Sequence, residues 1–466
     1  MTRPPPPAPP WTRLAPIAGA AALAALCVLA PGTASAQDFQ VPVEYYELDN
    51  GLRVVLSHDD TAPIATVAVY YNIGFRIEPR DRTGFAHLFE HMMFQGSENL
   101  GKLEFIKLVQ SNGGVLNGST RFDFTNYFEI VPAHTLETML WAEADRMRGL
   151  AITEVELKNQ QEVVKNEVRV NVLNQPYGGF PWLDMPQYAN ENWYNAHNFY
   201  GELEDLDAAS VEDVSAFFQR YYAPNNAALV VVGDFDEAQT REWIEHYFGD
   251  IPSAPDPVLP DISEPRQEAE KRFEKTDDKA TRPALAISWH APERNTPEYL
   301  AMGLLTQILT EGRDSRLYRS IVQENGYSGG VSGGINLLGN QFNVNGPTLL
   351  TVSLFHDETT SAEGIIRAVD EVVEDLRSNP VTEEELERAR VKMRSSILGS
   401  MEGFFGFGRA DLLAAFALFD DDPGRINELL TAFDDITPEL LRETAIEYLR
   451  STNRTILEVV PARAAT

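Results

Sequence analysis

The chain of 466 residues contains one cysteine, Cys27, which lies in an apolar segment near the N-terminus. Disulfide bonds, cysteine-ligated zinc and a cysteine nucleophile are therefore excluded for the rest of the chain. Positive charge is also scarce, because 38 Lys and Arg face 70 Asp and Glu, for a net charge of −32. Such a charge repels nucleic acid, so no nucleic-acid partner is expected. The acidic surface either keeps the protein soluble or attracts basic peptides.

Residues 1–36 have the composition of a secretory signal peptide. Arg3 and Arg13 provide positive charge, an apolar run covers about residues 15–30, and Ala34-Ser35-Ala36 is a small-residue cleavage site. The alternative is an uncleaved membrane anchor, although the run is short for a full span. We expect cleavage after Ala36, a periplasmic or secreted protein, and no membrane span in the mature chain.

The mature chain divides into two similar halves. A proline-rich and charged stretch, 251–279, is typical of a linker, which predicts domains over 37–250 and 280–466. Ile152–Leu157 matches Val381–Leu386 in pattern, and the helix–turn–strand pattern of 210–232 recurs over 437–460. The sequence therefore predicts an α+β fold made of two similar tandem domains.

The first half supplies most of the local structural signals. An Asn50-Gly51 turn predicts a hairpin, and Thr153 with Glu156 predicts a capping box at the start of a helix. The expected strands are 46–56 (two strands around the turn), 66–71, 117–131 (one or two strands) and 227–232, and the expected helices are 84–95 and 153–173.

The residues 84–95 carry the strongest chemical signal, in the sequence GFAHLFEHMMFQ. His87 and His91 are four residues apart, so on a helix both imidazoles lie on one face and can reach one ion. Glu90 lies beside them and is suited to act as the general base that takes a proton from a water molecule. The alternative is a pair of structural histidines on a buried helix, whose polar groups would need other partners.

A catalytic zinc needs a third protein ligand. The pattern H-x-x-E-H is the inverted zincin motif, and with a glutamate 76 positions after His91 the chain resembles the pitrilysin, insulysin and mitochondrial processing peptidase family. That resemblance implies one Zn²⁺ per chain, held by His87, His91 and Glu167. Glu162 is the competing carboxylate, five residues earlier and roughly 140° away around the helix.

The resemblance extends over nearly the whole mature chain and implies more about fold and substrate. In this family each domain is a mainly antiparallel sheet packed with helices. The segment 113–131 is similar to a strand pair whose edge strand binds extended peptides in relatives. Asn117 falls where the family usually has Asn, which makes it a candidate substrate contact; the alternative is a turn residue.

Two departures from the family pattern concern charge and assembly. Gln160 stands where many relatives have a glutamate seven residues before the third ligand. Val322 and Gly329 stand where many relatives have an Arg and a Tyr that help to bind substrate. We therefore expect a dimer, either a heterodimer with a metal-free paralogue that supplies the Arg/Tyr pair or a homodimer.

The second half lacks the metal ligands, because Gly303, Thr306, Gln307 and Ser396 align with His87, Glu90, His91 and Glu167. We therefore expect a catalytic first half and a metal-free second half. The predicted function is a zinc metalloendopeptidase that hydrolyses peptides or unfolded polypeptides. The alternative is a non-catalytic assembly or binding subunit of the same fold, which would have no need of Glu90.

Overall fold

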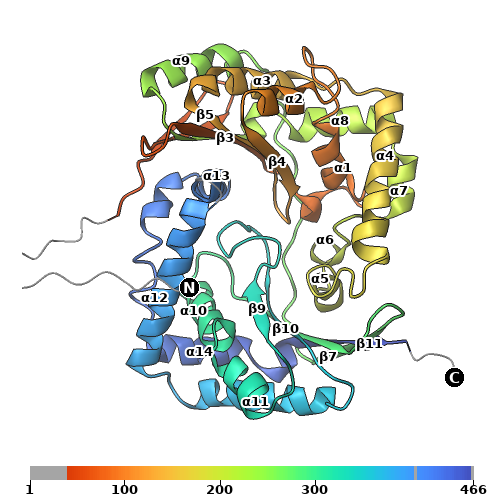
Figure 1. Ribbon diagram of the computed structural model, residues 1–466, viewed down its shortest axis with the longest axis vertical. Helices are drawn as coiled ribbons and strands as arrows, with labels where there is room; N and C mark the ends of the chain where they lie inside the picture. Colours follow the sequence, from red (N-terminus) through yellow and green to blue (C-terminus); the bar gives the residue numbers. More distant parts are fainter. Residues whose placement is uncertain (1–38, 404–406, 463–466) are drawn as a thin grey trace, which may run out of the picture. The chain divides into compact units, whose positions relative to one another are not determined.

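Two β-sheets organise the chain (Figure 1). The computed structural model describes residues 39–403 and 407–462, so the signal peptide predicted over 1–36 lies outside the described residues. In spatial order, the first sheet contains β1 (Glu44–Glu47), β2 (Arg53–His58), β6 (Ala227–Gly233), β3 (Ile64–Tyr71), β5 (Thr125–Pro132) and β4 (Val115–Thr120). The second contains β7 (Lys271–Asp277), β11 (Arg454–Pro461), β8 (Ala284–His290), β10 (Leu349–Phe355) and β9 (Ser332–Ile335).

The two sheets share one topology. In the first, β2 and β6 are parallel and the other pairs are antiparallel. In the second, β7 and β11 are parallel and the other pairs are antiparallel. Strands β2-β6-β3-β5-β4 therefore correspond in order and direction to β7-β11-β8-β10-β9, which confirms the predicted α+β fold with a repeated sheet.

Both halves also contain helices. The first half has α1 (Phe85–Met92), α2 (Glu104–Ser111), α3 (Leu136–Arg148), α4 (Glu154–Val168), α5 (Asp184–Ala189), α6 (Trp193–Ala196), α7 (Leu203–Ala208), α8 (Val211–Tyr221) and α9 (Glu237–Phe248). The second has α10 (Pro297–Thr310), α11 (Ala362–Ser378), α12 (Glu383–Glu402), α13 (Phe407–Asp420) and α14 (Pro438–Tyr448). Short 3₁₀ turns lie at Phe75–Ile77, Ala133–Thr135, Pro224–Asn226, Pro423–Asn427 and Ser451–Asn453.

Matching caps begin the repeated helices. The Thr153 hydroxyl accepts a hydrogen bond from the Glu156 amide at 3.2 Å, and the Thr382 hydroxyl accepts one from the Glu385 amide at 3.2 Å. Ser210 and Thr437 cap α8 and α14 in the same way. These oxygens satisfy amide groups that have no partner inside the helix, which is why Ser and Thr recur at these positions.

Three sequence predictions need correction. The capping box at Thr153 is only half formed, because the Glu156 carboxylate bonds Lys102 instead, at 2.6 Å. The helix expected over 153–173 changes to π-helical geometry over Arg169–Leu173. Residues 271–277, expected in the linker, form β7, whose residues are all exposed or half-buried and, with Phe273 as the only apolar one, gave no strand-like alternation of polar and apolar residues.

The first sheet is covered on both faces. On β3, Val67, Val69 and Tyr71 pack with α3, whereas Ala68 and Tyr70 face α13 on the opposite side (Figure 1). Alternate residues of a strand point to opposite faces, so burial on both sides explains why every residue from Val67 to Tyr71 is apolar or aromatic. The α13 helix belongs to the second half of the sequence, and the Tyr70 hydroxyl donates to Asp411 on this helix at 2.8 Å.

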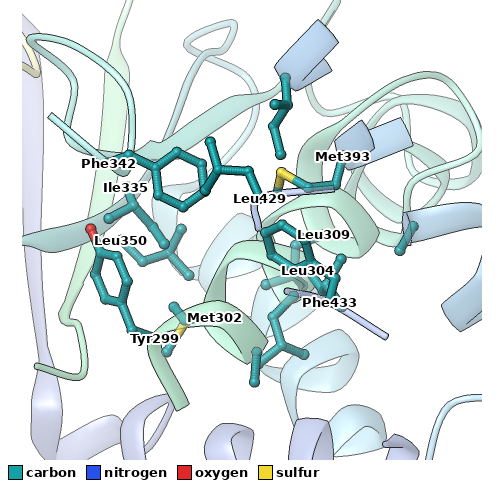
Figure 2. Packing of buried hydrophobic residues seen from close by; sticks show 14 of the residues in the cluster. Tyr299, Met302, Leu304, Leu309, Ile335, Phe342, Leu350, Met393, Leu429 and Phe433 are labelled. Atoms are coloured by element: carbon teal, nitrogen blue, oxygen red, sulfur yellow. The ribbon is translucent and has the colours of Figure 1, made fainter. Parts of the chain in front are cut away.

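The second half has its own apolar core around α10. Figure 2 shows Met302, Leu304 and Leu309 of that helix in one buried cluster with Leu350 and Met393. Burying a side chain of this size stabilises the fold by about 1.5–3 kcal/mol. Within the described residues, no helix has both the length and the apolarity needed to cross a membrane.

Candidate metal centre

Helix α1 carries both histidines of the motif. It begins after Gly84, whose φ of 79° lies in the left-handed region, where a glycine has no steric penalty. The buried carboxylate of Glu78 accepts hydrogen bonds from the amides of Gly84 at 2.7 Å and Ala86 at 3.1 Å. A carboxylate at a helix N-terminus also complements the helix dipole, so Glu78 fixes the start of α1 immediately before His87.

Helix α4 brings the third residue to the two histidines. The Oε2 atom of Glu167 lies 3.2 Å from Nε2 of His91, and its Oε1 atom lies 3.7 Å from Nε2 of His87. The two imidazole rings have centroids 4.9 Å apart and are nearly perpendicular, at 87°. One ligand atom from each of the three side chains lies within 4.8 Å of the others.

These distances fit one zinc ion. Ligands about 2.0–2.2 Å from zinc in a tetrahedral arrangement lie roughly 3.3–3.5 Å from one another. Burial lowers the pKa of His87 to about 4, and the charge of His91 adds to this, so the imidazole is neutral and has a free lone pair. The hydrogen bond from His91 lowers the pKa of Glu167, which keeps the carboxylate ionised. His87 and Glu167 are thus in the protonation states that a metal ligand requires.

Aromatic rings fix the orientation of His87. The ring centroids of Phe199 and Tyr200 each lie 5.1 Å from that of the imidazole. The Nδ1 atom of His87 is buried without a hydrogen-bond partner among the described residues. Packing against rings therefore holds this imidazole, where many metal sites use a hydrogen bond to the second nitrogen.

Glu90 points to the edge strand beside the histidines. Its carboxylate accepts a hydrogen bond from the Thr120 hydroxyl at 2.8 Å. Burial raises the pKa of Glu90, and the Thr120 hydrogen bond and the charge of His91 oppose that rise. A Cβ atom at Gly118 would lie 3.2 Å from Cγ of Glu90, so a glycine leaves room for this side chain. A carboxylate with a raised pKa next to the three candidate ligands is suited to exchange a proton with water.

The competing carboxylate lies apart from this group. Glu162 is exposed and bonds Lys165 at 2.5 Å, and it is not among the three clustered side chains. It is five residues before Glu167, so the turn of α4 directs it to another face.

Tyr200 is a residue that the sequence did not indicate. Its hydroxyl donates to Oε1 of Glu167 at 3.5 Å, a long hydrogen bond. Burial raises its pKa to about 12, so the hydroxyl keeps its proton. Tyr200 comes 33 residues after Glu167, in an irregular segment, and no spacing rule in a single sequence connects the two.

Asn117 lies on β4, the last strand of the first sheet. It is therefore a strand residue and not part of a turn. Its side-chain oxygen accepts a hydrogen bond from the Gly118 amide at 3.0 Å. It also lines a cavity of about 420 Å³ that reaches α13. The cavity and Glu90 thus both lie at β4, on opposite faces of the first sheet.

The second half shows no counterpart of the centre. Gly303, Thr306 and Gln307 lie on α10, and Ser396 lies on α12, none of them a carboxylate or an imidazole. Within residues 39–403 and 407–462, His87, His91 and Glu167 form the only group of at least three metal-binding side chains.

Two family models and several relatives match the chain. The model of "Insulinase (Peptidase family M16)" matches residues 53–191, and that of "Peptidase M16 inactive domain" matches residues 208–393. Zinc protease PqqE of Helicobacter pylori is 25% identical over 438 residues, which cover 91% of this chain and 94% of that protein. An insulin-degrading enzyme homolog of Dictyostelium discoideum is 30% identical over 213 residues, 44% of this chain and 21% of that protein.

Solved structures show the same fold. A protease from Helicobacter pylori has a TM-score of 0.81 at 24% identity and covers 90% of this chain and all of its own. The periplasmic protease PqqL from Escherichia coli has a TM-score of 0.73 at 17% identity, covering 91% of this chain and 48% of its own. With matching family models on both halves, the chain belongs to the insulinase/pitrilysin-type peptidase family M16.

Proposed function

We propose that this chain is a zinc-dependent endopeptidase that hydrolyses peptides or unfolded polypeptides. The observation that carries the proposal is the convergence of His87, His91 and Glu167, with Glu90 beside them and outside the ligand group. Relatives named as zinc proteases in several bacteria support it.

In this proposal His87, His91 and Glu167 hold one zinc ion. When bound, zinc polarises the carbonyl group of the substrate and lowers the pKa of water. Glu90 accepts a proton from the attacking water at its carboxylate and returns it to the amine nitrogen as the C–N bond of the peptide breaks. Thr120 orients Glu90 for both transfers through its hydrogen bond, and Tyr200 donates to Glu167.

The substrate in this proposal binds as an added strand along β4. Among the described residues that strand pairs with β5 alone, so its other edge has main-chain groups available for an extended peptide. Main-chain pairing requires little of the substrate sequence and needs an unfolded segment, which is the reason for proposing peptides and unfolded chains. Asn117 is the proposed side-chain contact on this strand.

The proposed organisation is a signal peptide over 1–36, a catalytic domain over 37–250, a linker that ends before β7 at Lys271, and a metal-free domain that includes β7 and the rest of the second half. The second half would enclose the substrate. Because Val322 and Gly329 replace the family's Arg/Tyr pair, we propose a dimer in the periplasm or outside the cell, with a metal-free paralogue as the preferred partner. Co-purification from the native host tests this, and a fully active homodimer without any paralogue would contradict the heterodimer.

The decisive experiment is cleavage of an unstructured peptide by the purified, zinc-loaded protein, with and without chelator. Glu90→Gln should retain zinc and lose turnover by about 10²–10⁴-fold, because only the proton transfer is removed. Glu162→Gln is the matched control and should retain full activity. A zinc-loaded wild type without any cleavage would favour the non-catalytic subunit, and full activity of Glu90→Gln would remove Glu90 as the base.

A further inference from the structure

The cavity beside β4 contains a charged group that the proposed chemistry does not use. The cavity lies on the face of the first sheet that packs against α13, opposite the face of Glu90. Asn117 and Ser119 face it from β4, and Arg121 follows directly after that strand. A peptide added along β4 would point every second side chain to this face.

The acceptors in the cavity are already occupied. One carboxylate oxygen of Asp411 accepts from the Tyr70 hydroxyl at 2.8 Å, and the other accepts from the side-chain amides of Asn340 at 3.1 Å and Asn343 at 3.0 Å. A carboxylate with three neutral donors has little capacity left for a ligand.

The donors of Arg121 are not occupied. Within the part of the chain that the structure describes, its guanidinium has no hydrogen bond and no direct ion pair; the carboxylates of Asp411 and Glu90 interact with its charge without bonding its N–H groups. Arg76, packed nearby, differs: its guanidinium bonds Asp123 at 2.6 Å, the Asn195 side chain at 2.5 Å and the Pro347 carbonyl at 3.0 Å. Arg76 is therefore a structural residue, and Arg121 leaves five N–H groups available at a cavity wall.

We propose that this cavity is a subsite for an acidic side chain of the bound peptide and that Arg121 is the residue that binds the carboxylate. The proposal rests on the proposed peptidase function and adds a substrate preference to it. The free groups of the cavity are the donors of Arg121, because the acceptors of Asp411 are already bonded, so a ligand that fits must supply acceptors. A carboxylate does so, because a guanidinium binds it through two parallel hydrogen bonds. Because Arg121 directly follows Thr120, the acidic residue lies within a few positions of the bond to be cleaved.

The test measures binding separately from cleavage. Zinc-loaded Glu90→Gln protein is titrated against labelled unstructured peptides that are identical except for one Glu, Gln or Lys, moved through the central positions. At one position we expect Glu to bind about tenfold more tightly than Gln, as a charge-assisted pair would give. In the same background, Arg121→Gln should bind the Glu and Gln peptides equally, and Arg121→Lys should retain part of the preference for Glu. Arg121→Glu should bind the Lys peptide most tightly.

The control is Arg313→Gln, at an exposed residue far from β4 in the sequence, which changes the net charge by the same amount as Arg121→Gln. It should leave the Glu-to-Gln ratio unchanged. The subsite would be overturned if Arg121→Gln left the Glu-to-Gln affinity ratio unchanged. It would also be overturned if that ratio were one at every peptide position. The peptidase function is tested separately. Cleavage by the wild type without any preference for Glu would reject only the subsite, whereas Arg121-dependent binding without cleavage would reject only the peptidase function.

Discussion

The hydroxyl of Thr120 donates a hydrogen bond of 2.8 Å to the carboxylate of Glu90, which links the edge strand β4 to the helix of the metal motif. This contact orients the proposed base without touching the candidate ligands. Thr120→Val preserves the shape of the side chain and removes the donor. We expect kcat to fall about tenfold, the cost of one hydrogen bond to a charged group, with KM unchanged.

Thr120→Ser retains the hydroxyl and should recover most of that loss. Steady-state kinetics on one unstructured peptide separates the two parameters. A rise in KM with an unchanged kcat would show instead that Thr120 acts in substrate binding.

The two carboxylates of α4 provide a matched pair for metal affinity. Glu167 lies 3.2 Å from His91, whereas Glu162 is exposed and bonds Lys165. Removing an outer partner of a metal ligand typically costs 10–100-fold in affinity, so loss of a ligand should cost at least about 100-fold. We expect this loss for Glu167→Gln and no change for Glu162→Gln, measured by competition with a chelator of known zinc affinity. Equal affinities would remove Glu167 from the ligand set.

Tyr200 should influence the metal through Glu167. Its hydroxyl donates at 3.5 Å, a long contact, so Tyr200→Phe should weaken zinc binding by less than about tenfold. Tyr247→Phe is the control, because it also removes a tyrosine–carboxylate hydrogen bond, to Glu137 at 3.0 Å, on an exposed surface. The same chelator competition checks both variants. An equal effect of the two would mean that general destabilisation, and not the contact with Glu167, is measured.

Local rules account for what the sequence predicted correctly. A spacing of four on a helix brings His87 and His91 to one face whatever the rest of the fold does. The repeated residue patterns of 152–157 and 381–386 predicted matching helices, and the structure places a threonine cap at the start of both. The proximity of Glu167 was expected from a family resemblance, because spacing alone cannot join residues 76 apart.

The missed features depend on packing between distant segments. Tyr200 reaches Glu167 from an irregular segment, and Arg121 stands out only because each guanidinium nitrogen of its neighbour Arg76 is hydrogen-bonded. Glu156 was expected to complete a capping box but bonds Lys102, 54 residues earlier, because an ion pair competes with the local bond. Neither the free donor nor the competing partner is visible in a single sequence.

A buried cluster of two acids and one base lies between the first sheet and α3. It consists of Glu129 on β5 and of Glu143 and Arg146 on α3. All three are at most 1% exposed. Arg146 bonds Glu143 directly, and its Nη2 atom lies 3.6 Å from Glu129. Burial, and then the charge of Glu143, raise the pKa of Glu129 well above its ordinary value of 4.5. An unpaired buried charge is costly, so Glu129 is the group that stays protonated in the folded state.

That assignment predicts a pH dependence of stability. A raised pKa in the folded state means that the contribution of Glu129 is fully present below its ordinary pKa and is lost as pH rises toward the raised value. Glu129→Gln mimics the protonated acid, so its free energy of unfolding should fall less than that of the wild type between about pH 5 and pH 8. Urea unfolding at several pH values measures the free energy of unfolding of both proteins. If the two free energies changed with pH in parallel, Glu129 would be ionised in the folded state.

Substitution of the second acid tests which carboxylate compensates Arg146. Glu129→Gln with Glu143→Gln leaves the buried guanidinium without a countercharge and should cost about 3–5 kcal/mol. Glu143→Gln alone should cost less, because Glu129 is 3.6 Å from Arg146 and can ionise in its place. Urea unfolding at neutral pH compares the three variants. If Glu143→Gln cost as much as the double variant, Glu129 would be unable to take over the ion pair, and the cluster would hold one fixed pair and one permanently neutral acid.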